Sequence, residues 1–208
     1  MGLARASFPY LAVSLAVSVL LGVLWRQTGH PAATAVFALA LMATGSIAWF
    51  FRDPERAIRR DAGLVLSPAD GTVRRIHRDG STQTIEIFMA VYNVHVQRVP
   101  VDGRVVSRTY TKGSYLVASG PSAGTRNTRC ATELRTRHGR VGVVQVAGAI
   151  ARKVECWVRP GESVAQGDRM GIIHFGSQVR LRLPRTAKVL VKPGDRVTAG
   201  TTVVAKWR

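Results

Sequence analysis

The sequence predicts a mainly β domain preceded by two apolar helices. Residues 1–51 contain two long uncharged stretches, whereas residues 52–208 consist of short β-branched segments separated by turn-forming residues. In addition, two short motifs each occur twice in the second part, which is typical of a fold built from repeated β units. We therefore expect a membrane anchor over residues 1–51 and a β domain over residues 52–208.

Two uncharged stretches, Phe8 to Trp25 and Ala32 to Phe51, each approach the roughly 20 apolar residues that a helix needs to cross a bilayer. Gly29 and Pro31 lie between them and favour a turn. A cleaved signal peptide is the alternative for the first stretch, because Arg5 precedes an apolar run. The second stretch follows directly and favours a helical hairpin. Arginines crowd the exit of this hairpin, so the positive-inside rule places the β domain in the cytoplasm, at the cell membrane.

The charge of the chain is strongly positive. It has 30 Lys and Arg against 12 Asp and Glu, which gives a formal net charge of +18. Such a balance indicates an anionic partner, either a nucleic acid or the anionic face of a membrane. We expect the membrane and no nucleic acid, because the chain has few aromatic residues and no nucleic-acid-binding motif. Cys130 and Cys156 show neither CxxC nor metal-ligand spacing, which predicts two free thiols in a reducing compartment and no metal site.

The β segments expected after residue 51 are short and often alternate between apolar and polar residues. They are LVLSPADGTVRRI (64–76), TIEIFMAVYNVHVQRV (84–99), GRVVSRTY (103–110), VGVVQVAGAIARKVECWV (141–158), RMGIIHF (169–175), QVRLRL (178–183) and KVLV (188–191). Helix signals are scarce in this region, and AGAIARKV (147–154) is the one ambiguous run.

Two internal repeats suggest pseudo-symmetric β-hairpin units. SPADGTV (67–73) recurs as VPVDGRV (99–105), and VRPGESVAQG (158–167) recurs as VKPGDRVTAG (191–200). The second motif resembles the hairpin of biotinyl and lipoyl carrier domains, which implies a barrel-sandwich-hybrid-like fold. Those carriers present a lysine flanked by methionines at a hairpin tip. No such tripeptide occurs here, which disfavours a carrier function.

The stretch GIIHFGSQVRL (171–181) alternates like a strand but is interrupted by Gly176 and Ser177. A β-bulge is one explanation, since glycine weakens a strand interior. Chemistry is the other. A serine hydroxyl can attack the carbonyl of its own preceding peptide bond, and a glycine before the serine offers the least steric resistance.

Two further residues could activate such a serine. Asp70 and His95, together with Ser177, supply an acid, an imidazole and a hydroxyl. The alternative for His95 is a structural histidine in a strand, and the alternative for Asp70 is a turn cap, which applies equally to Asp102.

The motifs FFRDPER, SPADGTV, NVHVQRVPVDGRV, VQVAGAIARKV and FGSQV together resemble the short, membrane-bound branch of the phosphatidylserine decarboxylases, from about Trp49 to the C-terminus. The resemblance implies autocatalytic cleavage between Gly176 and Ser177, and conversion of Ser177 into a pyruvoyl cofactor. It also implies decarboxylation of phosphatidylserine to phosphatidylethanolamine, a phospholipid substrate at a membrane, and two cleavage fragments that stay associated.

The resemblance also assigns the acid and the base. Asp70 takes the place of the aspartate that orients the base. Longer members carry two histidines three residues apart, and here His95 takes the first place while Arg98 fills the second. Because an arginine cannot accept a proton at working pH, we expect His95 to serve both self-cleavage and decarboxylation. The alternative base for self-cleavage is His174.

The stretch GTRNTRCAT resembles the Asn-Glu-Arg segment of the family, with Thr128 in place of the glutamate. It makes Asn127 and Arg129 candidate substrate contacts, for example to the lipid phosphate.

A second hypothesis is a membrane-tethered β carrier or scaffold in which Gly176 and Ser177 form only a bulge. The number of polypeptides in the purified protein, one or two, separates the hypotheses. The sequence leaves open the oligomeric state and whether the lipid is a diacyl ester or an archaeal-type ether.

Overall fold

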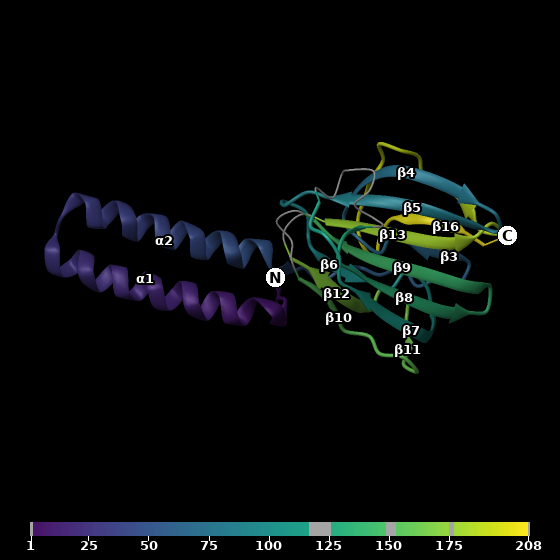
Figure 1. Ribbon diagram of the computed structural model, residues 1–208, viewed down its shortest axis with the longest axis horizontal. Coiled ribbons are helices and arrows are strands. Elements are labelled where there is room, and N and C mark those ends of the chain that lie inside the picture. Colours follow the sequence, from purple (N-terminus) through teal and green to yellow (C-terminus); the bar gives the residue numbers. More distant parts are fainter. Residues whose placement is uncertain (1, 117–125, 149–152, 175–176, 208) are drawn as a thin grey trace. The chain divides into compact units, whose positions relative to one another are not determined.

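The computed structural model of the chain describes residues 2–116, 126–148, 153–174 and 177–207. The chain divides into two compact units, residues 1–55 and residues 56–208. Two long helices dominate the first unit, and the second unit is built mainly of strands (Figure 1).

The first unit is a hairpin of two apolar helices. A short 3-10 helix, η1 (Arg5–Ser7), precedes α1 (Phe8–Thr28), and α2 (Pro31–Phe50) follows. Gly29 ends α1 in the left-handed conformation, with φ of 60°, and Pro31 opens α2, where an amide hydrogen is not needed. Both helices are long and apolar enough to cross a membrane. The two expected helices are thus present, with ends that differ by up to three residues.

A polar contact and an aromatic contact join the two helices. Ser18 Oγ lies 3.1 Å from Thr44 Oγ1, and the rings of Trp25 and Phe37 stack with centroids 5.5 Å apart. Contacts of this kind are common between helices in a bilayer. Two short strands, β1 (Gly2–Leu3) and β2 (Arg52–Asp53), pair antiparallel, so this unit continues beyond the end of α2.

The strands of the second unit form three sheets. The largest sheet is curled and has the order β11-β7-β8-β9-β13-β5-β4-β15, and the smaller sheets have the orders β10-β12-β6 and β14-β16-β3 (Figure 1). The strands are β3 (Leu64–Leu66), β4 (Gly71–Asp79), β5 (Thr82–Met89), β6 (Val96–Arg98), β7 (Gly103–Thr111), β8 (Arg129–Thr136), β9 (Gly139–Ala147), β10 (Val154–Cys156), β11 (Ser163–Val164), β12 (Arg169–Ile173), β13 (Ser177–Pro184), β14 (Lys188–Val189), β15 (Arg196–Val197) and β16 (Val203–Lys206). The expected mainly β fold with an N-terminal helical hairpin is confirmed.

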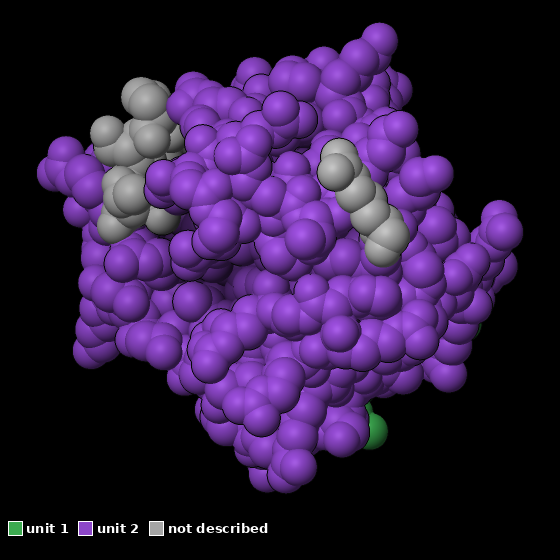
Figure 2. All heavy atoms as spheres, turned by 90° about the vertical axis from the view of Figure 1, so that its right-hand side faces the viewer, with its two compact units in different colours: residues 1–55 green, residues 56–208 purple. Residues whose placement is uncertain are grey.

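One hydrophobic core lies inside the second unit. Its side chains come from all three sheets, for example Val65 of β3, Leu181 of β13 and Ile173 of β12, and each of these is fully buried. Figure 2 shows one face of this unit as a closely packed surface of side chains. The burial of this apolar area is the main force that holds the sheets together.

The two sequence repeats fold into matching units. β15 pairs with the start of β4 through Val197 and Gly71, and β11 pairs with the start of β7 through Val164 and Gly103. Each of these two glycines faces a neighbouring backbone so closely that a Cβ atom would clash with a carbonyl oxygen. The repeats therefore mark a pseudo-symmetric pair of strand contacts, as their spacing predicted.

The strand prediction differs from the structure in two ways. β8 and β16 were not predicted, and the expected segments 64–76, 84–99 and 141–158 each span two strands. The segments 169–175 and 178–183 were expected separately, and their strands β12 and β13 belong to different sheets. The ambiguous run 147–154 lies partly outside the described residues.

Candidate active site

Ser177 is the first residue of β13, a central strand of the large sheet. It pairs with Met89 at the end of β5 and with Ala147 at the end of β9, so three strand ends meet at this residue. Its side chain is fully buried. Gly176, the other expected member of the cleavage site, lies outside the described residues. The sheet therefore holds the serine in place from both sides at one end of the domain.

The hydroxyl of Ser177 lies against a sulfur atom. Ser177 Oγ donates to Met89 Sδ over 3.3 Å, and the same sulfur receives a weak contact of 3.6 Å from Gln97 Nε2. A thioether is a weak acceptor and not a base. In this arrangement the hydroxyl is oriented but keeps its proton.

A buried pair of glutamines supports this end of the sheet. Gln97 Nε2 donates to the carbonyl oxygen of His95 over 2.7 Å, and Gln145 Nε2 donates to Gln97 Oε1 over 2.8 Å. Both glutamine side chains are fully buried. Buried amides need such partners, so the pair fixes β6 against β5 and β9 next to Ser177.

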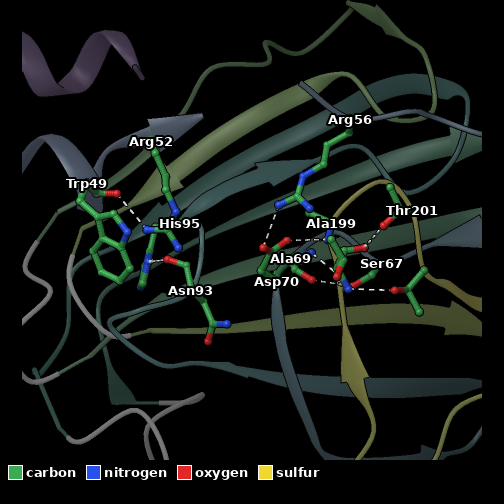
Figure 3. Close-up of polar contacts among 12 residues, drawn as sticks. Trp49, Arg52, Arg56, Ser67, Ala69, Asp70, Asn93, His95, Ala199 and Thr201 are labelled. Carbon is green, nitrogen blue, oxygen red and sulfur yellow. Dashed lines mark hydrogen bonds and ion pairs between the residues drawn. The ribbon is translucent and has the colours of Figure 1, made fainter. Parts of the chain in front are cut away.

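His95 directly precedes β6 and is fully buried. Its Nδ1 lies 2.9 Å from the carbonyl oxygen of Asn93 (Figure 3). Because a carbonyl oxygen only accepts, this bond places the ring proton on Nδ1 and the basic lone pair on Nε2. The imidazole is thus held in the tautomer that can take up a proton at Nε2.

Asp70 makes contacts other than those expected of a triad. Its Oδ2 binds Arg56 at 2.9 Å, and its Oδ1 accepts the N–H of Ala199 over 2.8 Å (Figure 3). Within the described part of the chain, the carboxylate is therefore held by these two groups, and the Ser177 hydroxyl is held by Met89.

The pseudo-symmetry explains one of these contacts. Asp102 occupies the position of Asp70 in the other repeat, and its Oδ1 accepts the N–H of Gln166 over 2.7 Å. Each aspartate thus ties its turn to the end of the matching P-G-x-x-V-x-x-G segment. The ion pair with Arg56 is the additional contact of Asp70.

Arg98 stands at the place of the second family histidine. It is 5% exposed, and its guanidinium donates to the carbonyl oxygen of Gly167 over 2.9 Å. This contact ties β6 to the turn that ends the first P-G-x-x-V-x-x-G segment. A guanidinium supplies positive charge and donors but no base.

His174, the alternative base, follows β12 and is 2% exposed. Its Nε2 lies 3.2 Å from Glu155 Oε1, which also pairs with Lys153 Nζ at 2.7 Å. Burial lowers the pKa of His174 below its ordinary value, although the Glu155 carboxylate opposes this shift. The imidazole is therefore neutral near pH 7.

Asn127 is fully buried and uses its amide on the backbone. Its Nδ2 donates to the carbonyl oxygens of Leu116 and Ala147, both over 2.8 Å, and its Oδ1 accepts the N–H of Leu116 over 2.9 Å. It thus joins the segment after β7 to the residue that pairs with Ser177. Arg129, the other expected substrate contact, donates to the carbonyl oxygen of Asn127 over 3.3 Å.

Comparison with known proteins identifies the family. The family model for phosphatidylserine decarboxylase matches residues 44–205. A protein of Symbiobacterium thermophilum is 40% identical over 213 residues, which cover 98% of this chain and 95% of the relative. A protein of Aromatoleum aromaticum is 41% identical over 211 residues, with the same coverage of 98% and 95%. Both relatives are named phosphatidylserine decarboxylase proenzyme.

The chain belongs to the phosphatidylserine decarboxylase family. The recognition from the motifs is confirmed, and the chain is an enzyme of the decarboxylase class. The word proenzyme in the names of the relatives refers to a precursor that is processed.

Sequence reasoning missed the polar residues that support Ser177 in this phosphatidylserine decarboxylase family member. Gln145 stands in an otherwise apolar run, VVQVA, whereas Gln97 stands between Val96 and Arg98 in HVQRV. A single amide in such a run was the available signal, because a buried amide needs a partner. No sequence pattern indicated that Met89 would contact Ser177. Within the described residues, no group of three or more His, Cys, Asp or Glu side chains gathers to hold a metal ion.

Proposed function

We propose that this chain cleaves itself between Gly176 and Ser177, converts Ser177 into a pyruvoyl group, and then decarboxylates phosphatidylserine to phosphatidylethanolamine. One observation carries the proposal. In a chain of this family, a fully buried serine that follows a glycine opens the central strand of the sheet. Its hydroxyl is oriented by Met89 and shielded from water.

The site fits a pyruvoyl group at residue 177. Such a group would be the first residue of the small fragment, and here that residue is the first of β13. Its strand pairs on both sides, with β5 and with β9. Loss of the bond before residue 177 leaves these pairings in place. The ketone would therefore be held where the hydroxyl is held now.

The chemistry of maturation needs little beyond the chain itself. Ser177 Oγ attacks the carbonyl carbon of Gly176, and the peptide bond is replaced by an ester with a free amine at residue 177. A base then removes the α-proton of residue 177, and the Gly176 carboxylate leaves. The remaining dehydroalanine is hydrolysed, with loss of ammonia, to the pyruvoyl group. We propose His95 Nε2 as the base, because its tautomer places a lone pair there.

In decarboxylation the pyruvoyl group supplies a ketone that draws the electrons released when the substrate carboxylate leaves as carbon dioxide. The protein orients the carboxylate and excludes water. His95 Nε2 returns a proton to the carbon that has lost the carboxylate. The link from the His95 carbonyl through Gln97 to Met89 keeps this histidine in register with residue 177.

The other site residues take supporting roles in the proposal. Asn127 shapes the segment beside Ala147, and Arg129 supplies a cation for the lipid phosphate. The triad with Asp70 stays a prediction, since its contacts support a role in holding the turn at Ala199.

The first unit is the proposed membrane anchor. Two apolar helices and the arginines that follow them support an anchor in the cell membrane, with residues 52–208 on the cytoplasmic side. There the net positive charge would attract anionic phospholipid headgroups. The two cleavage fragments remain associated through β13.

Ser177→Ala tests the proposal. Alanine has no hydroxyl to attack the peptide bond and no route to a ketone, so we expect one uncut chain and no release of carbon dioxide from phosphatidylserine. Intact mass spectrometry of the unmodified chain should show two species, residues 1–176 and residues 177–208. Ser163→Ala is the matched control, because Ser163 also opens a strand but is exposed.

Two outcomes would refute the proposal. One is an active wild-type chain that remains a single polypeptide; a single polypeptide without activity would favour the scaffold hypothesis. The other is carbon dioxide release by the Ser177→Ala variant.

A further inference from the structure

The two cysteines, far apart in the sequence, lie together between two sheets. Cys130 is on β8 of the large sheet, and Cys156 is on β10 of a small sheet. Thr132 lies two residues after Cys130, so both side chains point to the same face of β8. The hydroxyl of Thr132 is 3.3 Å from Cys156 Sγ, which places the Cys156 sulfur on this face. Cys156 packs against the core cluster to which Cys130 belongs.

A cation approaches the pair from the neighbouring strand. Arg108 of β7 is the register partner of Thr132, and its guanidinium donates to the carbonyl oxygens of Cys156 and Val158, each over 3.2 Å. Positive charge and hydroxyl donors near a sulfur favour its thiolate form. The four side chains, Cys130, Thr132, Cys156 and Arg108, are called the thiol cluster below.

The two thiols differ in acidity. The hydrogen bond from Cys130 lowers the pKa of Cys156, with further contributions from Thr132 and Arg108, whereas burial opposes this shift. The pKa of Cys130 is raised, first by its hydrogen bond to Cys156 and then by burial. One thiol of the cluster is thus suited to attack, while the other keeps its proton.

Access differs in the same direction. β10 is an edge strand of its sheet, and Cys156 is partly exposed, whereas Cys130 is 3% exposed. Among the described residues, Cys156 is therefore the more accessible of the two thiols, and Cys130 lies behind it in the core.

We propose that the thiol cluster is a reversible oxidation site, in which Cys156 reacts with a small-molecule disulfide and Cys130 then closes an intramolecular disulfide. The Cys156 thiolate attacks one sulfur of the oxidant, for example oxidised glutathione, and releases one glutathione thiolate. The Cys130 thiol gives its proton to that thiolate and attacks the Cys156 sulfur, which releases the second glutathione thiolate. The two protein thiols lose two electrons in total, and the oxidant is reduced to two thiols.

The product would join the large sheet to the small sheet that contains β12, the strand before Ser177. Both cysteines precede residue 176, so the disulfide would form within the large fragment whether or not the chain is cleaved. The proposal is therefore independent of the proposed self-cleavage.

The test uses the full chain in detergent, reduced and then exposed to oxidised glutathione, with free thiols blocked by N-ethylmaleimide before intact mass spectrometry. We expect the wild-type protein to lose both free thiols without retaining glutathione. Cys130→Ser should stop at one bound glutathione on Cys156. Cys156→Ser should react at least about tenfold more slowly, because Cys130 is buried and protonated.

Thr132→Val tests whether the hydroxyl of Thr132 activates Cys156, or whether the closeness of the two thiols is sufficient for the reaction. Valine keeps the branched shape of threonine but removes the hydroxyl, so Cys156 should be alkylated more slowly at an unchanged melting temperature. The proposal is overturned if wild-type protein accumulates a stable glutathione adduct, if the disulfide forms between two chains on a non-reducing gel, or if Cys130→Ser reacts no faster than Cys156→Ser.

Discussion

At the scale of single residues, the contact between Ser177 and Met89 has a direct chemical meaning. A hydroxyl that donates to a thioether is held in one orientation, but a thioether does not take up its proton. An attack on the preceding carbonyl therefore requires a rearrangement that brings a base to the hydroxyl. This contact is consistent with a precursor that folds before it reacts.

His95 is the residue whose role matters most for the proposed mechanism. We expect His95→Ala to accumulate the uncut chain, because the proposed base at Nε2 is lost. Activity of any cleaved protein should fall by about 10²–10⁴-fold for want of the general acid. Gel electrophoresis and carbon dioxide release measure the two steps separately.

The opposite pattern would limit the role of His95. Complete cleavage with slow turnover would confine it to decarboxylation and direct attention to His174 as the base for cleavage. Normal cleavage with normal turnover would remove it from the mechanism.

The matched turns allow a controlled test of Asp70. Asp70→Asn and Asp102→Asn each keep a side-chain oxygen for the N–H that the aspartate binds, but only the first removes an ion pair. From these contacts we expect Asp70→Asn to lower the free energy of unfolding by about 1 kcal/mol and Asp102→Asn by less, and the predicted triad adds that only Asp70→Asn should cleave slowly. Denaturant unfolding and a cleavage time course provide the measurements. Cleavage of Asp70→Asn at the wild-type rate would contradict the triad and leave Asp70 the role of holding its turn.

At the scale of elements, the junction between β12 and β13 shows where sequence reasoning ends. The alternation of residues 171–181 correctly predicted β structure, yet the two halves belong to different sheets. Periodicity reports which side chains are buried but not against which partner. β8 was missed for a related reason, because its alternating RCATELRT mixes charged and small residues and lacks a strong β-branched run.

The site was predicted in part. Ser177 and His95 were selected as candidates because Gly–Ser and a histidine in a strand are unusual in themselves, and their roles stay proposals. The roles of Gln97, Gln145 and Asn127 depend on contacts between strands that are distant in the sequence, and no local pattern reports such contacts. The structural contact of Asp70 with the N–H of Ala199 is explained by the matching contact of Asp102, and the sequence does not show either contact.

The contact between His174, which follows β12, and Glu155 of β10 predicts that the stability of the protein depends on pH. The pKa of His174 is lower in the folded protein than its ordinary value of 6.5, so the unfolded chain binds more protons as the pH falls below about 6.5. Stability is therefore full above this pH and declines below it. The pKa of Glu155 is also lowered, mainly by Lys153 against the effect of burial, and its own stabilisation is lost only near and below its ordinary value of 4.5.

We expect the melting temperature to fall between about pH 7.5 and about pH 5.5, and the fall to be smaller in His174→Gln, which does not titrate. His138→Gln is the control, since His138 lies on a polar turn far from Glu155 in the sequence. An equal fall in wild type and His174→Gln would show that other groups cause it.

At the scale of the whole molecule, the buried hydrophobic cluster of the second unit lies within residues 65–205 of the described chain, with Trp207 packed at its border. Residues 56–208 alone should therefore fold and show a cooperative melting transition. Their net positive charge should bind vesicles that contain anionic lipid, more weakly as salt rises. Sedimentation with anionic and with zwitterionic vesicles at low and high salt measures this. Binding that is equal in all four conditions would argue against electrostatic docking.

The central position of β13 has a consequence for how the enzyme folds before and after cleavage. A cut before Ser177 would turn a one-chain protein into two chains whose shared sheet has the shorter chain in its middle. Before the cut, folding is a search within one molecule; after it, refolding would require two molecules to meet. The native state would thus form readily from the one-chain precursor. Dilute, separated fragments would regain it only slowly, because they must first associate.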